Sequence, residues 1–399
     1  MADVTDFQRF HREVLPKLIE RHGALALADV QPVGALGIAT PSGAFTYLPG
    51  PDTIEVVEGS DAARTVVSMD DESFGGLVAD LETAPGLLYG GRVEVVRGNP
   101  LRFVRWEPAL RALFHGRPIY DAETISLLDR SGAPLDPGAS FTMADLGRRP
   151  ADVRHFFETA GYLHVRQVFT DAEVASFLED AGILQAGARE GDQNSWWGRT
   201  ATGTSVLTRV LNAADRPRLR ALYDDDRLAA IAAVPAVPLV AKDTTGRDAV
   251  TVLWKLPDVR EGLADLPWHR DCGMGGHALN CPSVVLTICL NDGSAAAGEL
   301  RALPGSHLTS SPFIDGTAAE APRGVSLAAS RGDVTIHYTD VMHASMAPTS
   351  ASGPHRISVL LSFTQPTAAH HRGGRHYNDV LLGAEDGQVA HLVDRVGGR

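Results

Sequence analysis

Two runs of strand-forming residues in the C-terminal half of the chain are apolar on both faces. They are residues 250–254 (Val-Thr-Val-Leu-Trp) and 283–290 (Ser-Val-Val-Leu-Thr-Ile-Cys-Leu). A strand with one face in water alternates apolar and polar side chains, so these runs are expected in a layer that is covered on both sides. Together with residues 334–338 and 356–363, they favour a double-stranded β-helix, or jelly roll.

The chain is expected to contain two domains, because its 399 residues exceed the usual size of one. Residues 1–117, the N-terminal unit, combine an amphipathic helix with short β-prone runs and a closing helix. Residues 118–150 are rich in proline and glycine with little periodicity, which indicates a linker. Residues 151–399 contain the predicted jelly roll and its flanking helices. The fold class expected for the whole chain is therefore α+β.

A candidate metal site begins with His269 and Asp271. Residues two apart in an extended strand point to the same side, so the imidazole and the carboxylate are expected to face one way. His343 ends a later hydrophobic stretch, and the strands of a jelly roll can bring it back to the same mouth. Two histidines and one carboxylate form the facial triad that binds Fe(II) and leaves three coordination positions open. We therefore assign His269, Asp271 and His343 as catalytic metal ligands.

The order of the motifs resembles the phytanoyl-CoA dioxygenase family of Fe(II)- and 2-oxoglutarate-dependent oxygenases, over about residues 150–366. The resemblance is carried by His269-Arg270-Asp271, Gly298-Glu299-Leu300, Pro304-Gly305-Ser306-His307, Gly332-Asp333 with the strand leading to His343, and Arg356-Ile357-Ser358. It implies Fe(II), 2-oxoglutarate and O2 as cofactors, and hydroxylation of a small hydrophobic or amphipathic metabolite with release of succinate and CO2. The alternatives are a desaturase, epoxidase or ring-forming oxidase with the same iron site and, in another class, a non-catalytic lipid- or metabolite-binding protein.

The same resemblance indicates which residues bind the co-substrate. Arg356 matches the family's position for the distal carboxylate of 2-oxoglutarate, and Ser345 matches a hydroxyl that also contacts it. His337 competes with His343 as a ligand but lies six residues too early for the family register, so we assign it to structure. Further candidates are Thr287, Ser358 and Lys255 for the co-substrate pocket, and His277, Asn280 and Trp254 for the substrate.

The N-terminal unit resembles the sterol-carrier-protein lipid-binding fold. A helix over a small sheet, and the run Leu87-Leu88-Tyr89-Gly90-Gly91-Arg92 before a closing helix, carry this resemblance. It implies a lipid carrier, and the alternative is a small domain that packs on the enzyme or forms a homo-oligomer. Every residue assigned to chemistry lies beyond 250, so the N-terminal unit is expected to be separable from the site.

Composition excludes several classes of partner. The net charge of −13, without a local run of Lys or Arg, argues against nucleic acid and anionic membranes as partners. No stretch reaches the roughly 20 consecutive apolar residues that membrane insertion requires. Three cysteines are too few for a secreted disulfide framework, and no basic region followed by an apolar run opens the chain. We therefore expect a cytoplasmic protein with a small-molecule substrate.

Overall fold

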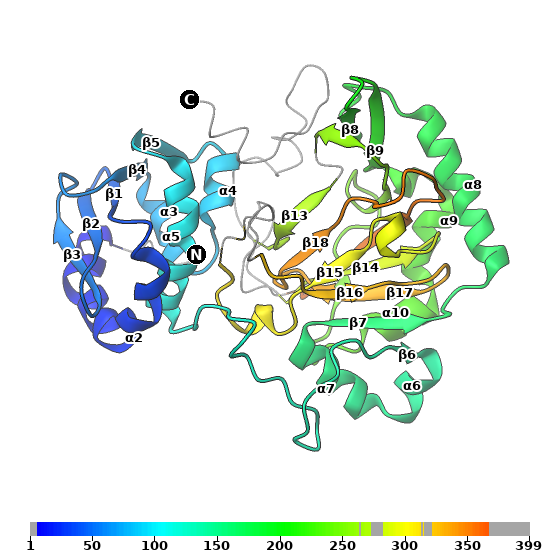
Figure 1. Ribbon diagram of the computed structural model, residues 1–399, viewed down its shortest axis with the longest axis horizontal. Helices are drawn as coiled ribbons and strands as arrows, with labels where there is room; N and C mark the ends of the chain where they lie inside the picture. Colours follow the sequence, from blue (N-terminus) through cyan, green and yellow to red (C-terminus); the bar gives the residue numbers. More distant parts are fainter. Residues whose placement is uncertain (1–5, 263–264, 273–281, 313, 315–320, 367–399) are drawn as a thin grey trace.

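The computed structural model has a mixed α+β fold built on three sheets (Figure 1). It describes residues 6–262, 265–272, 282–312, 314 and 321–366. The substrate candidates His277 and Asn280 lie outside these residues. In the described part of the chain, no helix is both long enough and apolar enough to cross a membrane.

The N-terminal unit is a five-stranded sheet with helices packed against it. Its strand order is β3-β2-β1-β4-β5, with β1 and β4 parallel and the other neighbours antiparallel. The elements are α1 (Phe7–Arg9), α2 (Leu15–Val30), β1 (Leu36–Thr40), β2 (Gly43–Pro49), β3 (Ile54–Glu58), β4 (Thr65–Met69), α3 (Asp71–Val78), α4 (Ala84–Tyr89), β5 (Val93–Arg97) and α5 (Pro100–His115).

A single apolar core holds the N-terminal unit together. Leu15 of α2, Ile38 of β1 and Trp106 of α5 are fully buried in it. The Trp106 indole also donates a hydrogen bond to the carbonyl of Gly34 at 2.8 Å, which satisfies its one polar atom. Asp70 caps α3 by accepting from the backbone amide of Ser73, as the Asp-rich sequence before this helix predicts.

The rest of the chain forms a ten-stranded sheet and a four-stranded sheet. The larger sheet has the order β12-β8-β9-β11-β19-β14-β17-β7-β6, with β10 also pairing β19, and the smaller has the order β13-β18-β15-β16. Their strands are β6 (Phe141–Thr142), β7 (Tyr162–Arg166), β8 (Ser195–Thr200), β9 (Ser205–Val210), β10 (Val240–Ala241), β11 (Val250–Trp254), β12 (Val259–Glu261), β13 (Leu266–His269), β14 (Val284–Cys289), β15 (Leu300–Ala302), β16 (Val325–Leu327), β17 (Val334–Tyr338), β18 (His343–Ser345) and β19 (Ile357–Thr364).

The two apolar runs lie inside the larger sheet. Every residue of β11 and of β14 is buried, which agrees with the coverage on both sides that the sequence indicates. The helices of this part are α6 (Met143–Arg148), α7 (Pro150–Ala160), α8 (Asp171–Gly187), α9 (Pro217–Arg220) and α10 (Asp226–Ala232). Apolar residues of α7, α8 and α10 share one core with the outward-facing side chains of β11 and β14.

Gly161 determines how α7 joins the sheet. It has a φ of +85° and ends the helix in the left-handed region, which a glycine adopts without strain. A Cβ at this position would lie 2.4 Å from a side-chain atom of Val341, so the turn also needs a residue without a side chain. The carbonyl of Gly161 accepts from the amide of Tyr338, which ties the turn to the end of β17.

The segment between the two parts lies along the C-terminal part of the chain. The amide of Tyr120 donates to the carbonyl of Ser310 at 2.8 Å, and β6 pairs in parallel with β7. The side chain of Tyr120 is buried in a small apolar cluster with Trp268 and Met342. Residues 120–142 are therefore attached to the C-terminal part of the chain at both ends of the segment.

Candidate metal centre

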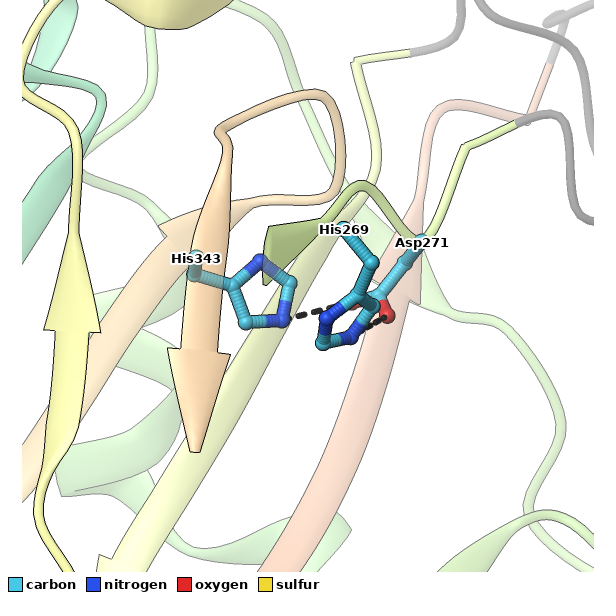
Figure 2. A group of neighbouring side chains, drawn as sticks. All are labelled: His269, Asp271 and His343. Atoms are coloured by element: carbon cyan, nitrogen blue, oxygen red, sulfur yellow. Dashed lines mark ion pairs between the residues drawn. The ribbon is translucent and has the colours of Figure 1, made fainter. Parts of the chain in front are cut away.

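Three side chains, from two paired strands and the residues after one of them, converge at one end of the smaller sheet (Figure 2). His269 is the last residue of β13 and faces His343, the first residue of β18, in the strand register. Asp271 follows β13. Its Oδ1 lies 3.5 Å from Nε2 of His269, and its Oδ2 lies 3.8 Å from Nε2 of His343. One ligand atom from each residue lies within 4.8 Å of the others, a spacing that suits one metal ion.

Hydrogen bonds fix which nitrogen of each imidazole can bind a metal. Nδ1 of His269 lies 2.7 Å from the carbonyl oxygen of Pro267, and Nδ1 of His343 lies 2.9 Å from that of Val341. A carbonyl oxygen only accepts, so both Nδ1 atoms carry the proton. Both Nε2 atoms therefore keep a free lone pair on the side of Asp271, which is the tautomer of a metal-binding histidine.

The charge states also fit a divalent cation. Burial holds the pKa of His343 well below its ordinary value, and the neighbouring His269 and His337 lower it further. Burial alone would raise the pKa of Asp271, but the neighbouring His343, His269 and His337 outweigh this effect and hold the pKa well below the usual range. Neutral imidazoles beside an ionised carboxylate are the forms that coordinate a metal. The residues present therefore fit Fe(II).

A third histidine lies against this group. Nε2 of His337, in β17, is 3.6 Å from Oδ2 of Asp271, and its ring centroid is 4.3 Å from that of His343. The side chain is buried, and within the described chain neither ring nitrogen has a hydrogen-bond partner. The sequence assignment of His337 to structure overlooked this proximity. The alternation along β17 could have indicated it, because side chains two apart share the inner face of the sheet.

The co-substrate candidates form a second group beside the first. The guanidinium of Arg356 donates to Oγ of Ser345 at 2.5 Å, to the carbonyl of Gly298 at 2.7 Å and to Oγ of Ser358 at 3.4 Å. Arg356 is buried, and this burial lowers its pKa. Among the described residues, no carboxylate lies within ion-pair distance of it. The structure thus places a buried, uncompensated cation between two hydroxyl groups.

Lys255 adds a second buried cation to this region. Its Nζ donates to Oδ1 of Asp265 at 2.8 Å and to the carbonyl of Ser345 at 2.9 Å. Burial lowers the pKa of Lys255 to about 8, with Asp265 acting in the opposite direction and Arg356 in the same one. Lys255 therefore contacts the same serine as Arg356.

Two other candidates occupy different environments. Thr287 is buried in β14 and pairs with Thr335 of β17, two residues along the strand from His337. Trp254 belongs to the apolar core beneath the larger sheet, together with Val252. Since neighbouring residues of a strand face opposite sides, Trp254 points away from the face that carries Lys255.

Comparison with known proteins gives a family and several similar folds. The family described as Phytanoyl-CoA dioxygenase (PhyH) matches residues 157–357. No curated protein matches the chain. One similar solved structure is EvdMO1, at 25% identity over 55% of this chain and 50% of that chain, with a TM-score of 0.44. Another is AviO1 from Streptomyces viridochromogenes Tue57, at 25% identity over 56% of this chain and 98% of that chain, with a TM-score of 0.42. A third is the non-heme alpha ketoglutarate dependent epimerase SnoN, at 24% identity over 59% of this chain and 90% of that chain, with a TM-score of 0.46. The chain thus spans about half the length of EvdMO1.

Proposed function

Because this chain belongs to the phytanoyl-CoA dioxygenase family and is a 2-oxoglutarate-dependent non-haem iron enzyme, we propose that it hydroxylates a small hydrophobic or amphipathic metabolite. Succinate and CO2 would be released in the same turnover. The observation that carries the proposal is the pair of Nε2 lone pairs that His269 and His343 direct toward Asp271. Three protein ligands on one side of a metal leave room for a bidentate co-substrate and for O2.

The strand order supports a double-stranded β-helix around this site. The central strands of the larger sheet run β11-β19-β14-β17, and the smaller sheet runs β13-β18-β15-β16. From β11 onward, strands that follow one another along the chain alternate between the two sheets, apart from the β15–β16 hairpin and the outer strand β12. We propose that these two sets of strands are the two layers of the jelly roll.

The remaining roles follow from the charges and donors around the metal ligands. A bound Fe(II) would supply the redox chemistry with O2 and 2-oxoglutarate. Arg356 would bind the distal carboxylate of 2-oxoglutarate, and a charge-assisted contact of this kind contributes roughly 1.5 to 3 kcal/mol. The hydroxyls of Ser345 and Ser358 hold the guanidinium and can donate to the same carboxylate. Lys255 raises the positive potential beside it.

We also propose the division of the chain into an accessory N-terminal unit (residues 1–117), a linker (118–150) and an oxygenase domain (151–399). The separate apolar core of the N-terminal unit supports this division. The similarity of that unit to lipid carriers, and assembly of the protein into a homo-oligomer through it, remain predictions.

The proposal is tested by incubating the Fe(II)-loaded protein with 2-oxoglutarate, O2 and a panel of apolar and amphipathic metabolites. Succinate formation, measured by mass spectrometry, should rise in the presence of a substrate. The mass of the oxidised product separates hydroxylation, which adds one oxygen atom, from desaturation, which removes two hydrogens. The His343→Ala variant is the control. If the loaded protein neither binds 2-oxoglutarate nor forms succinate, the chain is a non-catalytic binding protein.

A further inference from the structure

The segment that carries two of the three metal ligands has weak backbone support. We call residues 266–272 the ligand segment. It begins with β13, an edge strand of the smaller sheet, which pairs only with β18 in the described chain. The register shifts between Leu266 and His269, so the pairing is irregular. After β13, the amides of Asp271 and Cys272 both donate to one carbonyl, that of Thr339.

Side-chain ion pairs compensate for this at both ends of the segment. Just before its start, Asp265 pairs with Lys255, the residue after β11, at 2.8 Å. At its end, the side chain of Arg270 lies between those of His269 and Asp271 in the sequence and faces the opposite side of the chain. Arg270 is 9% exposed, and its Nη2 donates to both carboxylate oxygens of Glu107, at 3.0 and 3.1 Å.

Glu107 belongs to α5, in the N-terminal unit, and is 4% exposed. A buried charge is tolerated only when it is paired. The ion pair between Glu107 and Arg270 therefore favours one position of the N-terminal unit relative to the ligand segment. No other part of the described N-terminal unit makes a bidentate ion pair with the ligand segment.

The second metal-binding strand is connected to the same contact. Asp340, three residues before His343, accepts from Nη1 of Arg270 at 3.4 Å. Its other carboxylate oxygen lies 3.6 Å from Arg111 of α5 and 3.5 Å from Arg117. Both strands that provide metal ligands are therefore linked to the N-terminal unit by buried charges.

This network ends inside the N-terminal unit. Arg111, 3% exposed, donates to both oxygens of Asp80, at 2.7 and 3.0 Å. Asp80 has a φ of +59° in the turn after α3, a conformation that is uncommon for a residue other than glycine. The ion pair with Asp80 thus holds Arg111 in the position from which it also contacts Asp340.

We propose that Glu107 is a positioning residue for the metal centre, through which the N-terminal unit holds Arg270 and thereby fixes His269 and Asp271. This inference rests on the proposed function, since it assumes that the triad binds a metal. It assigns the N-terminal unit a part in forming the site, although that unit contributes no ligand. Residues that orient metal ligands commonly change metal affinity by about 10- to 100-fold when they are replaced.

The test compares two buried glutamates of the N-terminal unit. Glu107→Gln breaks the pair with Arg270, whereas Glu82→Gln breaks a pair with Arg92 that lies within the unit. Glu82 is 6% exposed, so the two replacements are matched in burial and chemistry. Mn(II), which replaces Fe(II) without reacting with oxygen, is titrated into each full-length protein, and free Mn(II) is measured by electron paramagnetic resonance. Circular dichroism sets a temperature at which both variants are folded.

Both variants should unfold at a lower temperature than the unsubstituted protein, but only Glu107→Gln should weaken Mn(II) binding, by about tenfold or more. Glu107→Asp and Glu82→Asp, which keep the charge, form a milder pair in case the glutamine variant does not fold. Glu107→Asp should then show the smaller loss of affinity, and Glu82→Asp none. Equal Mn(II) affinities in the two members of a pair would overturn the inference.

A further control separates this inference from the proposed function. If the unsubstituted protein binds Mn(II) no more tightly than His343→Ala does, the metal site is refuted and the inference falls with it. If binding depends on His343 but not on Glu107, the metal site stands and only the positioning role of Glu107 is lost.

Discussion

The regions around Arg270 and Arg356 differ in what balances a buried arginine charge. Arg270 contacts the carboxylates of Glu107 and Asp340. Arg356 contacts only hydroxyl and carbonyl oxygens among the described residues. A guanidinium whose charge is neutralised by the protein has a structural use, whereas one that is buried without a counter-charge is arranged for an anionic ligand. The difference supports a structural role for Arg270 and the proposed co-substrate role for Arg356.

The largest expected effect concerns the candidate metal ligands His269, Asp271 and His343. His269→Ala, Asp271→Ala and His343→Ala should each reduce succinate formation to background, because each removes one of three protein ligands. His337→Ala should keep bound iron. Iron content after desalting, measured by mass spectrometry, checks both statements. Iron loss in His337→Ala together with retention in His343→Ala would show that His337 is the ligand.

The comparison itself is tested by removing each arginine in turn. Arg270→Leu should lower the free energy of unfolding by roughly 3 to 5 kcal/mol, because the buried carboxylate of Glu107 loses its ion-pair partner. Arg356→Leu should change it by less than about 1 kcal/mol, because the loss of hydrogen bonds is offset by removal of an uncompensated charge. Urea unfolding followed by circular dichroism measures both. Similar losses in the two variants would contradict the distinction.

Lys255 sharpens the comparison as an intermediate case, since its carboxylate partner Asp265 is partly exposed. Burial lowers its pKa to about 8 from 10.5, so the unfolded chain binds more protons than the native state between these pH values. The destabilising effect of the buried charge is fully present below pH 8 and disappears as the pH rises toward 10.5. Relative to Lys255→Met, the protein should therefore gain up to about 3 kcal/mol over this window. A constant difference in urea stability between pH 7.5 and 10 would refute the shift.

The smallest expected effect is on co-substrate affinity. Arg356→Leu removes the charge that we propose binds the distal carboxylate of 2-oxoglutarate, but it leaves the candidate metal ligands in place. The KM for 2-oxoglutarate should rise by about tenfold or more, which corresponds to roughly 1.4 kcal/mol. Mn(II) affinity should be unchanged and serves as the control. An unaltered KM would remove Arg356 from the co-substrate pocket.

The sequence predicted the features that depend on local pattern. The pattern Thr170-Asp171-Ala172-Glu173 is typical of a capping box, and the structure has this capping box at the start of α8. The convergence of His269, Asp271 and His343 was predictable because a known order of motifs specifies which strands return to the same end. Each of these inferences needed only a few neighbouring residues or a fixed motif order.

Features that depend on contacts between distant segments could not be predicted. Arg270 is a charged residue in a short motif, and nothing near it in the sequence identifies Glu107 as its partner, 163 positions away. The sequence analysis treated the N-terminal unit as separable from the site because the ion pair between Arg270 and Glu107 cannot be seen in the sequence. Trp254 was considered for the substrate because it lies near the metal motif, but strand alternation turns it into the core.

The ion pair between Arg270 and Glu107 has a reciprocal consequence. Thermodynamic linkage requires that, if docking of the N-terminal unit strengthens metal binding, metal binding strengthens docking by the same factor. A metal ion bound by His269 and Asp271 would then stabilise α5, although no residue of this helix is a metal ligand. Hydrogen exchange of the α5 backbone amides should slow when Mn(II) is added, and the slowing should vanish in Glu107→Gln. Hydrogen exchange in α5, a helix of the N-terminal unit, would thus show whether the metal is bound.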